Sequence, residues 1–133
     1  MNKLQRQALE DIEMLAKVLD PKMVDFDYWK RKDEVCGTKA CLAGYAIIFL
    51  PSVQKLGLSL KKINNSNPFF EPAIKNKRSA GFDNYTRGLN SLAKAFGIPF
   101  EITAKIFGDY YGLETSLALK TSASTIKKYL RNH

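Results

Sequence analysis

The feature that most restricts how this chain can fold is the apolar segment over residues 40–50, which is interrupted only by Gly44. It reads ACLAGYAIIFL, carries no charged side chain, and is followed directly by Pro51. A helix that is apolar on all sides must be covered by other elements on all sides. With Thr38 as a favourable N-cap and Pro51 as a stop, the segment predicts a buried helix over 38–50. Gly44 would let a neighbouring helix approach it closely.

Apolar side chains recur at helical spacing on both sides of this segment, which predicts a single all-α domain over residues 1–133. We expect a compact bundle of four to six helices around the buried central one. Asn2 and Gln5 form a capping-box pattern before the first helix. Alternation typical of a strand occurs only near residues 56–63. The helices other than the central one are expected at residues 4–19, 53–60, 85–96, 100–107 and 122–130.

A long basic connection, at about 61–84, is the least regular part of the predicted domain. It contains the loop-forming run NNSNP and the basic run KNKR. A connection of this length in a compact domain is often a functional loop. We therefore treat its basic residues as candidates for binding.

The net charge of +8 is distributed unevenly along the chain. Residues 1–34 hold seven basic and eight acidic side chains, whereas residues 35–133 hold fourteen basic and five acidic ones. Such an excess attracts an anionic partner, which could be an acidic protein surface, a nucleic acid or a nucleotide. It equally fits a charge that only maintains solubility.

Hydropathy predicts a chain that acts in the cytoplasm and away from membranes. No apolar run approaches the ~20 residues that cross a bilayer, and the first residues contain no secretory signal. We expect reduced thiols and neither a metal nor a cofactor. The oligomeric state is left open by the sequence.

The two cysteines, Cys36 and Cys41, flank the predicted start of the central helix. If Thr38 caps this helix, Cys41 occupies its third position, where the helix dipole lowers the pKa of a thiol. The pair could act as a redox couple, as a metal clamp or as a nucleophile, or could simply pack in the core. Because the chain has a single histidine, His133, we assign both cysteines a structural role together with Trp29 and Gly44.

The segment 36–46 reads CGTKACLAGYA. It resembles a motif of small uncharacterised bacterial and bacteriophage proteins, Cys-Gly-Thr-x-x-Cys-(Leu/Ile)-Ala-Gly-(Trp/Tyr)-Ala. An upstream aromatic such as Trp29 and later segments such as 95–98 and 106–108 are similar to patterns in those proteins. The resemblance implies a helical fold and no known activity. A bacteriophage origin would place the protein in the host cytoplasm.

The sequence contains none of three common catalytic or nucleotide-binding motifs. No nucleotide-binding glycine motif, metalloprotease motif or serine-hydrolase motif occurs. The carboxylate pair Asp25 and Asp27 lies in a charged connector, where solvated or capping roles are common. We therefore predict that the protein is not an enzyme.

Three functions remain open at this point. The first is a non-catalytic basic binding protein, such as a bacteriophage-encoded modulator or inhibitor that acts on a host protein or nucleic acid. The second is a binder of a nucleotide or another phosphate compound, because helix N-termini bind anions. The third is a thiol redox protein that uses Cys36 and Cys41. The candidate phosphate-binding residues are Gly37, Thr38, Lys39, Lys75, Lys77, Arg78 and Arg87.

Overall fold

The structure is a computed structural model that describes residues 1–24, 30–33, 37–63, 69–108 and 113–133. Over these residues the chain forms six α-helices, one short 3-10 helix and four strands. The α-helices are α1 (Lys3–Val18), α2 (Leu42–Phe49), α3 (Pro51–Lys55), α4 (Asn84–Phe96), α5 (Phe100–Phe107) and α6 (Thr115–Asn132). The other elements are η1 (Pro21–Met23), β1 (Lys30–Asp33), β2 (Gly37–Ala40), β3 (Leu58–Lys62) and β4 (Phe69–Ile74).

The four strands form one antiparallel sheet in the order β2-β1-β4-β3. The fold is therefore mainly helical, as predicted, but the stricter prediction of an all-α bundle is wrong. β1, β2 and β4 read KRKD, GTKA and FFEPAI, and none of them alternates apolar with polar residues, so the period-two pattern of a strand is missing from them. β3 falls within the one stretch where alternation was noted, and β4 occupies residues 69–74 of the connection expected to be irregular.

The central helix is shorter than the sequence predicts. α2 begins at Leu42 with Cys41 as its N-cap, and residues 37–40 form strand β2 instead of its first turn. β2 pairs with β1 so that Lys39 lies opposite Arg31. Pairing with β1 gives the backbone of residues 37–40 the hydrogen bonds that a helical turn would otherwise supply.

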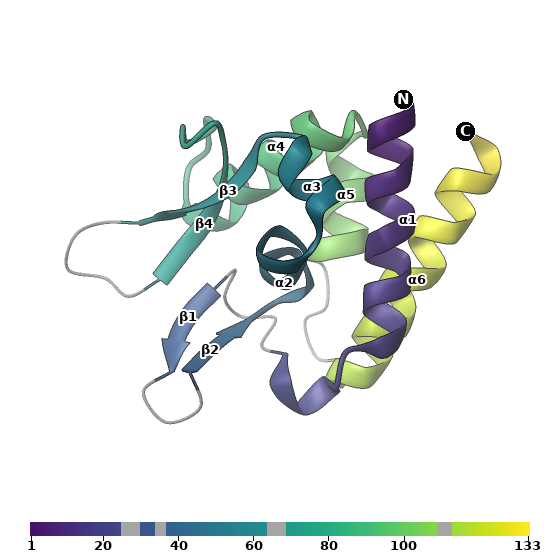
Figure 1. The fold of residues 1–133 in the computed structure, drawn as a ribbon, viewed down its shortest axis with the longest axis horizontal. Coiled ribbons are helices and arrows are strands. Elements are labelled where there is room, and N and C mark those ends of the chain that lie inside the picture. The colour runs from purple at the N-terminus through teal and green to yellow at the C-terminus, as the bar shows by residue number, and fades with distance from the viewer. Residues whose placement is uncertain (25–29, 34–36, 64–68, 109–112) are drawn as a thin grey trace.

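Helix α2 is buried from Leu42 to Ile47, as its apolar sequence requires, and its last residue, Phe49, is exposed. It lies in the middle of the molecule, between the strands on one side and the paired helices α1 and α6 on the other (Figure 1). α1 and α6 pack along each other in opposite directions, so the two ends of the chain lie at the same end of the molecule. None of the helices among the described residues combines the length and the hydropathy that crossing a bilayer requires.

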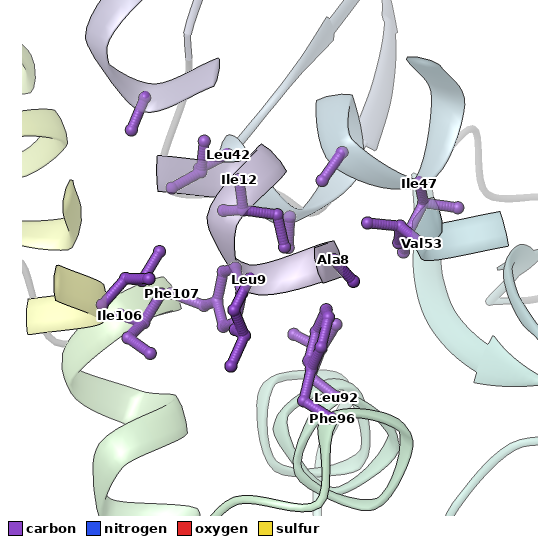
Figure 2. Close-up of a cluster of buried hydrophobic side chains, with 14 of the residues drawn as sticks. Ala8, Leu9, Ile12, Leu42, Ile47, Val53, Leu92, Phe96, Ile106 and Phe107 are labelled. Atoms are coloured by element: carbon purple, nitrogen blue, oxygen red, sulfur yellow. The ribbon is translucent and has the colours of Figure 1, made fainter. Parts of the chain in front are cut away.

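The hydrophobic core forms where α1, α2, α4 and α5 meet (Figure 2). α1 contributes Leu9 and Ile12, both fully buried. Phe96 at the end of α4 stacks on Phe107 at the end of α5, with ring centroids 5.8 Å apart. These two rings join the α4–α5 corner to the rest of the core.

Local signals correctly placed several helix ends. Asn2 and Gln5 form the predicted capping box, in which each side chain bonds the backbone of the other residue. Gly97 ends α4 in the left-handed conformation, with φ of 66°, and α5 then runs over the predicted residues 100–107. α6 is longer than expected, because it begins at Thr115.

We predict that Phe96→Ala lowers the free energy of unfolding by about 3–5 kcal/mol, because it leaves a cavity beside Phe107. Phe100→Ala, which removes the same ring from a position with 38% of its surface exposed, should cost about 1 kcal/mol or less. Urea denaturation of the two variants measures the difference. Equal losses would contradict the assignment of Phe96 to the core.

Candidate functional site

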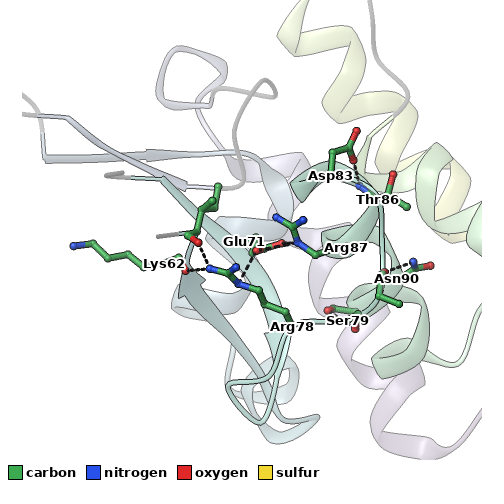
Figure 3. A network of polar contacts seen from close by, with 11 residues as sticks. Lys62, Glu71, Arg78, Ser79, Asp83, Thr86, Arg87 and Asn90 are labelled. Carbon is green, nitrogen blue, oxygen red and sulfur yellow. Dashed lines mark hydrogen bonds and ion pairs between the residues drawn. The ribbon is translucent and has the colours of Figure 1, made fainter. Parts of the chain in front are cut away.

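The carboxylate of Glu71, on β4, is fully buried and is held between two arginines (Figure 3). Nε of Arg78 lies 3.1 Å from Oε1, and Nε of Arg87 lies 3.0 Å from Oε2. A buried carboxylate requires such partners, because removing it from water costs several kcal/mol. The three residues form what we call the Glu71 clamp, which connects the sheet to α4.

Arg78 also forms hydrogen bonds with the end of β3, the strand next to β4. Its guanidinium donates hydrogen bonds to the backbone oxygens of Lys62, at 2.7 Å, and of Ile63. One arginine therefore bonds both the buried carboxylate and the end of β3. Most of the donors on Arg78 are thus directed at atoms of the protein itself.

The segment that follows Arg78 is bonded closely to α4. The hydroxyl groups of Ser79 and Ser91 lie 2.8 Å apart, and Nδ2 of Asn90 donates to the backbone oxygen of Ala80 at 2.7 Å. A Cβ atom at Gly81 would lie only 2.6 Å from the backbone nitrogen in α4, at residue 87, which makes glycine necessary here. These contacts hold residues 79–81 against the helix.

Asp83 ends this segment as the N-cap of α4. Its Oδ1 accepts a 2.8 Å hydrogen bond from the backbone N–H of Thr86. The hydrogen bonds from Thr86 and the nearby positive charge of Arg87 lower the pKa of the Asp83 carboxyl below its ordinary value of 3.8. The carboxylate is therefore favoured as the capping form.

The structure disperses the residues predicted to bind phosphate. Arg78 and Arg87 belong to the Glu71 clamp. Lys75 and Lys77 are exposed in the turn after β4, where the backbone of Lys75 is left-handed with φ of 51°. The side chains of Lys75 and Lys77 are exposed and take no part in the Glu71 clamp.

The other predicted phosphate residues, Gly37, Thr38 and Lys39, lie on β2 at one edge of the sheet. The prediction that they stand at a helix N-terminus is wrong, because α2 begins only at Leu42. Lys39 shares a row of the sheet with Arg31 and Phe69, and Lys75 lies six residues after Phe69, just past the end of β4. This separation is about 20 Å along the strand, so residues 75–78 do not cover residues 37–39 as a lid.

The structure describes two of the four residues to which the sequence assigns a structural role. Cys41 and Gly44 are both buried at α2, but Cys41 is the N-cap and not the third helical residue. Cys36 and Trp29 lie outside the described residues. Within the described ranges, no three histidine, cysteine, aspartate or glutamate side chains gather closely enough to hold a metal.

A basic surface lies on α6. Lys120, Lys127, Lys128 and Arg131 are exposed on this helix, and none of them forms an ion pair within the part of the chain that the structure describes. We call these four residues the α6 basic face. Lys120 lies before residue 122, where the sequence predicts that this helix begins, although the positions 120, 127 and 131 follow helical spacing.

The α6 basic face is bordered by a hollow on each side. On the α1 side lies a groove of about 560 Å³, and on the α5 side lies a hollow of about 530 Å³. Both volumes fall in the range of ligand-binding pockets. The adjacent residues Lys127 and Lys128 point to different sides, since Lys127 lines the groove with α1 and Lys128 lines the hollow with α5.

Comparisons with protein-family models, with curated proteins and with solved structures find no match to this chain. The function must therefore be inferred from the geometry of the described residues alone.

We predict that Arg87→Leu lowers the free energy of unfolding by about 2 kcal/mol, because a buried carboxylate loses one of its two partners. Glu71→Gln should cost less, since the side chains of Arg87 and Arg78 are 21% and 36% exposed and can be hydrated. Lys17→Leu, which breaks a pair between a half-exposed lysine and the partly buried Glu13, is the control and should cost about 1 kcal/mol or less. Chemical denaturation gives the order, and a larger loss for Glu71→Gln would contradict the clamp.

Low pH should reduce the stability that the Asp83 carboxylate contributes. Because the pKa of Asp83 is lowered on folding, its carboxylate stabilises the folded state above the unfolded pKa of 3.8. This contribution is lost as the pH falls through the lower, folded-state pKa. Asp83→Asn should therefore reduce the loss of stability below about pH 4. Thermal melts of both proteins between neutral and acidic pH test this, and identical profiles would refute it.

Proposed function

We propose that the protein is a non-catalytic binding protein whose α6 basic face engages an acidic surface of another protein. One observation carries the proposal: four exposed cations on one helix have no ion-pair partner within the described chain. A cluster of like charges on a folded surface carries an electrostatic cost that an anionic partner relieves. The same cluster accelerates the encounter with that partner.

The two arginines of the Glu71 clamp contrast with the cations of the α6 basic face. Arg78 and Arg87 are bonded to a buried carboxylate and maintain the fold. On α1, Arg6 and Lys17 likewise pair with Glu10 and Glu13. The cations of α6 lack such partners among the described residues, which supports a role outside the molecule.

Apolar side chains near α6 favour a protein over a nucleic acid. Leu117 on α6 is half-exposed, and Ala16, Leu19 and Leu119 line the groove between α1 and α6. A phosphate backbone is recognised mainly by cations and hydrogen-bond donors. Protein interfaces, in contrast, surround apolar contacts with a polar rim.

The polar network around Glu71 is used internally, which supports a role without catalysis. Glu71 is fully buried and bonded to both arginines, so it is not presented to a substrate. Cys41 is also buried, whereas a reactive thiol requires access. A protein of this kind acts by covering a surface of its partner, as a modulator or inhibitor does.

A small anionic ligand is the second candidate, and one observation favours it. The hollow between α5 and α6 is lined by Lys105 and Lys128 together with the hydroxyl-bearing residues Ser124, Thr125 and Tyr129. This arrangement could hold a phosphate group. The residues predicted from the sequence for this role lie elsewhere, in the sheet and in the Glu71 clamp.

The proposed function can be tested with labelled poly-L-glutamate as a mimic of an acidic protein surface. We expect fluorescence anisotropy to show binding that weakens with salt, because exposed charges are screened. A variant that changes all four residues of the α6 basic face to glutamate should lose this binding. Inorganic phosphate and a single-stranded oligonucleotide serve as the competing anions.

The matched control changes four exposed lysines on the β3–β4 side to glutamate: Lys55, Lys62, Lys75 and Lys77. Both variants carry the same net charge, so a response to charge alone would affect them equally. Retained binding in the control supports the α6 basic face. Equal loss in both variants, or binding of the oligonucleotide or of phosphate without poly-L-glutamate, would contradict the proposal.

A further inference from the structure

We propose that the groove between α1 and α6 receives an acidic amphipathic helix of the partner protein. This inference rests on the proposed function and specifies how the partner is held. The groove belongs to helices that lie side by side and in opposite directions (Figure 1). Laying a third helix over two others is a common way to bind an amphipathic segment.

Small residues create the groove. Ala16 on α1 and Ala123 on α6 both line it, where larger side chains would fill the space between the two helices. Leu119 and Leu19 complete a floor that is mainly apolar. Such a floor fits the apolar side of a helix and offers little to a fully charged ligand.

Lysines form the rim of the groove. Lys120 and Lys127 line it from α6, and Lys17 lines it from α1. One acidic side chain, Glu13, also lines the groove, and it is already bonded to Lys17 at 2.9 Å. The rim therefore carries a net positive charge that complements acidic residues beside the apolar side of the partner helix.

The dimensions of the groove agree with a helix of about three turns. Its lining residues on α6 extend from Ser116 to Lys127, which corresponds to about 16 Å of helix. Lys120 and Lys127 stand seven residues apart, or about two turns, which is the spacing between positions i and i+7 of an incoming helix. Acidic residues at that spacing can meet both lysines while the apolar side covers Ala123.

The test uses two synthetic peptides of identical composition, each about 15 residues long and built from leucine and glutamate. In the first, the leucines lie on one side of the helix; in the second, they are distributed around it. Fluorescence anisotropy should show that the amphipathic peptide binds at least about tenfold more tightly than its isomer. Equal affinities would overturn the inference.

Adjacent lysines provide the matched variants, because Lys127 lines the groove and Lys128 does not. Lys127→Glu should weaken binding of the amphipathic peptide about tenfold or more, and Lys128→Glu by less than about threefold. Ala123→Leu should weaken it to a similar extent by filling the floor with no change in charge. Circular dichroism melts check that each variant is folded. If Ala123→Leu does not fold, the two lysine variants still decide the question.

The outcomes separate this inference from the proposed function. Equal effects of Lys127→Glu and Lys128→Glu, with poly-L-glutamate binding still dependent on α6, would overturn the groove and leave the α6 basic face intact. Binding of poly-L-glutamate that does not depend on α6 would instead remove the proposed function on which the groove rests. A folded Ala123→Leu protein that binds the peptide normally would also overturn the groove.

Discussion

The absence of a polar face on α2 is the constraint to which the rest of the fold responds. A helix of this kind is stable only when every side is covered, and α1, α3 and the strands β2, β3 and β4 all contact it. The sheet supplies cover on the side that the helices leave open, with Leu58 of β3 joining the same core. A mixed architecture therefore follows from one apolar segment.

The sheet buries a carboxylate, which requires cationic partners. Glu71 lies on β4 where α4 packs, and its carboxylate is satisfied by Arg78 and Arg87 from the two sides. Two of the most conspicuous basic residues in the sequence are thus used to join the sheet to a helix. Their role shows why the position of a cation, and not its mere presence, decides whether it is available to a partner.

The α6 basic face and the groove beside it combine the two requirements of a selective interface. Charge brings an acidic partner close and excludes basic ones, and an apolar floor distinguishes among acidic partners by shape. Both features come from the same helix, whose inner side packs on α1 through Ala123 and Leu119. A rigid, pre-formed surface of this kind loses little entropy when it binds.

The sequence by itself determined those features that depend on neighbouring residues. The capping box at Asn2 and the left-handed Gly97 follow from interactions within one or two turns of the chain. The burial of residues 42–47 could be predicted because their segment has no polar side to expose. Only the tertiary structure decided that residues 37–40 form a strand, because this depends on pairing with β1. It also decided that Arg78 and Arg87 bond Glu71, from which they are 7 and 16 residues away in the sequence. It likewise decided that Lys127 faces a groove, because that groove exists only where α6 meets α1, more than a hundred residues earlier in the chain.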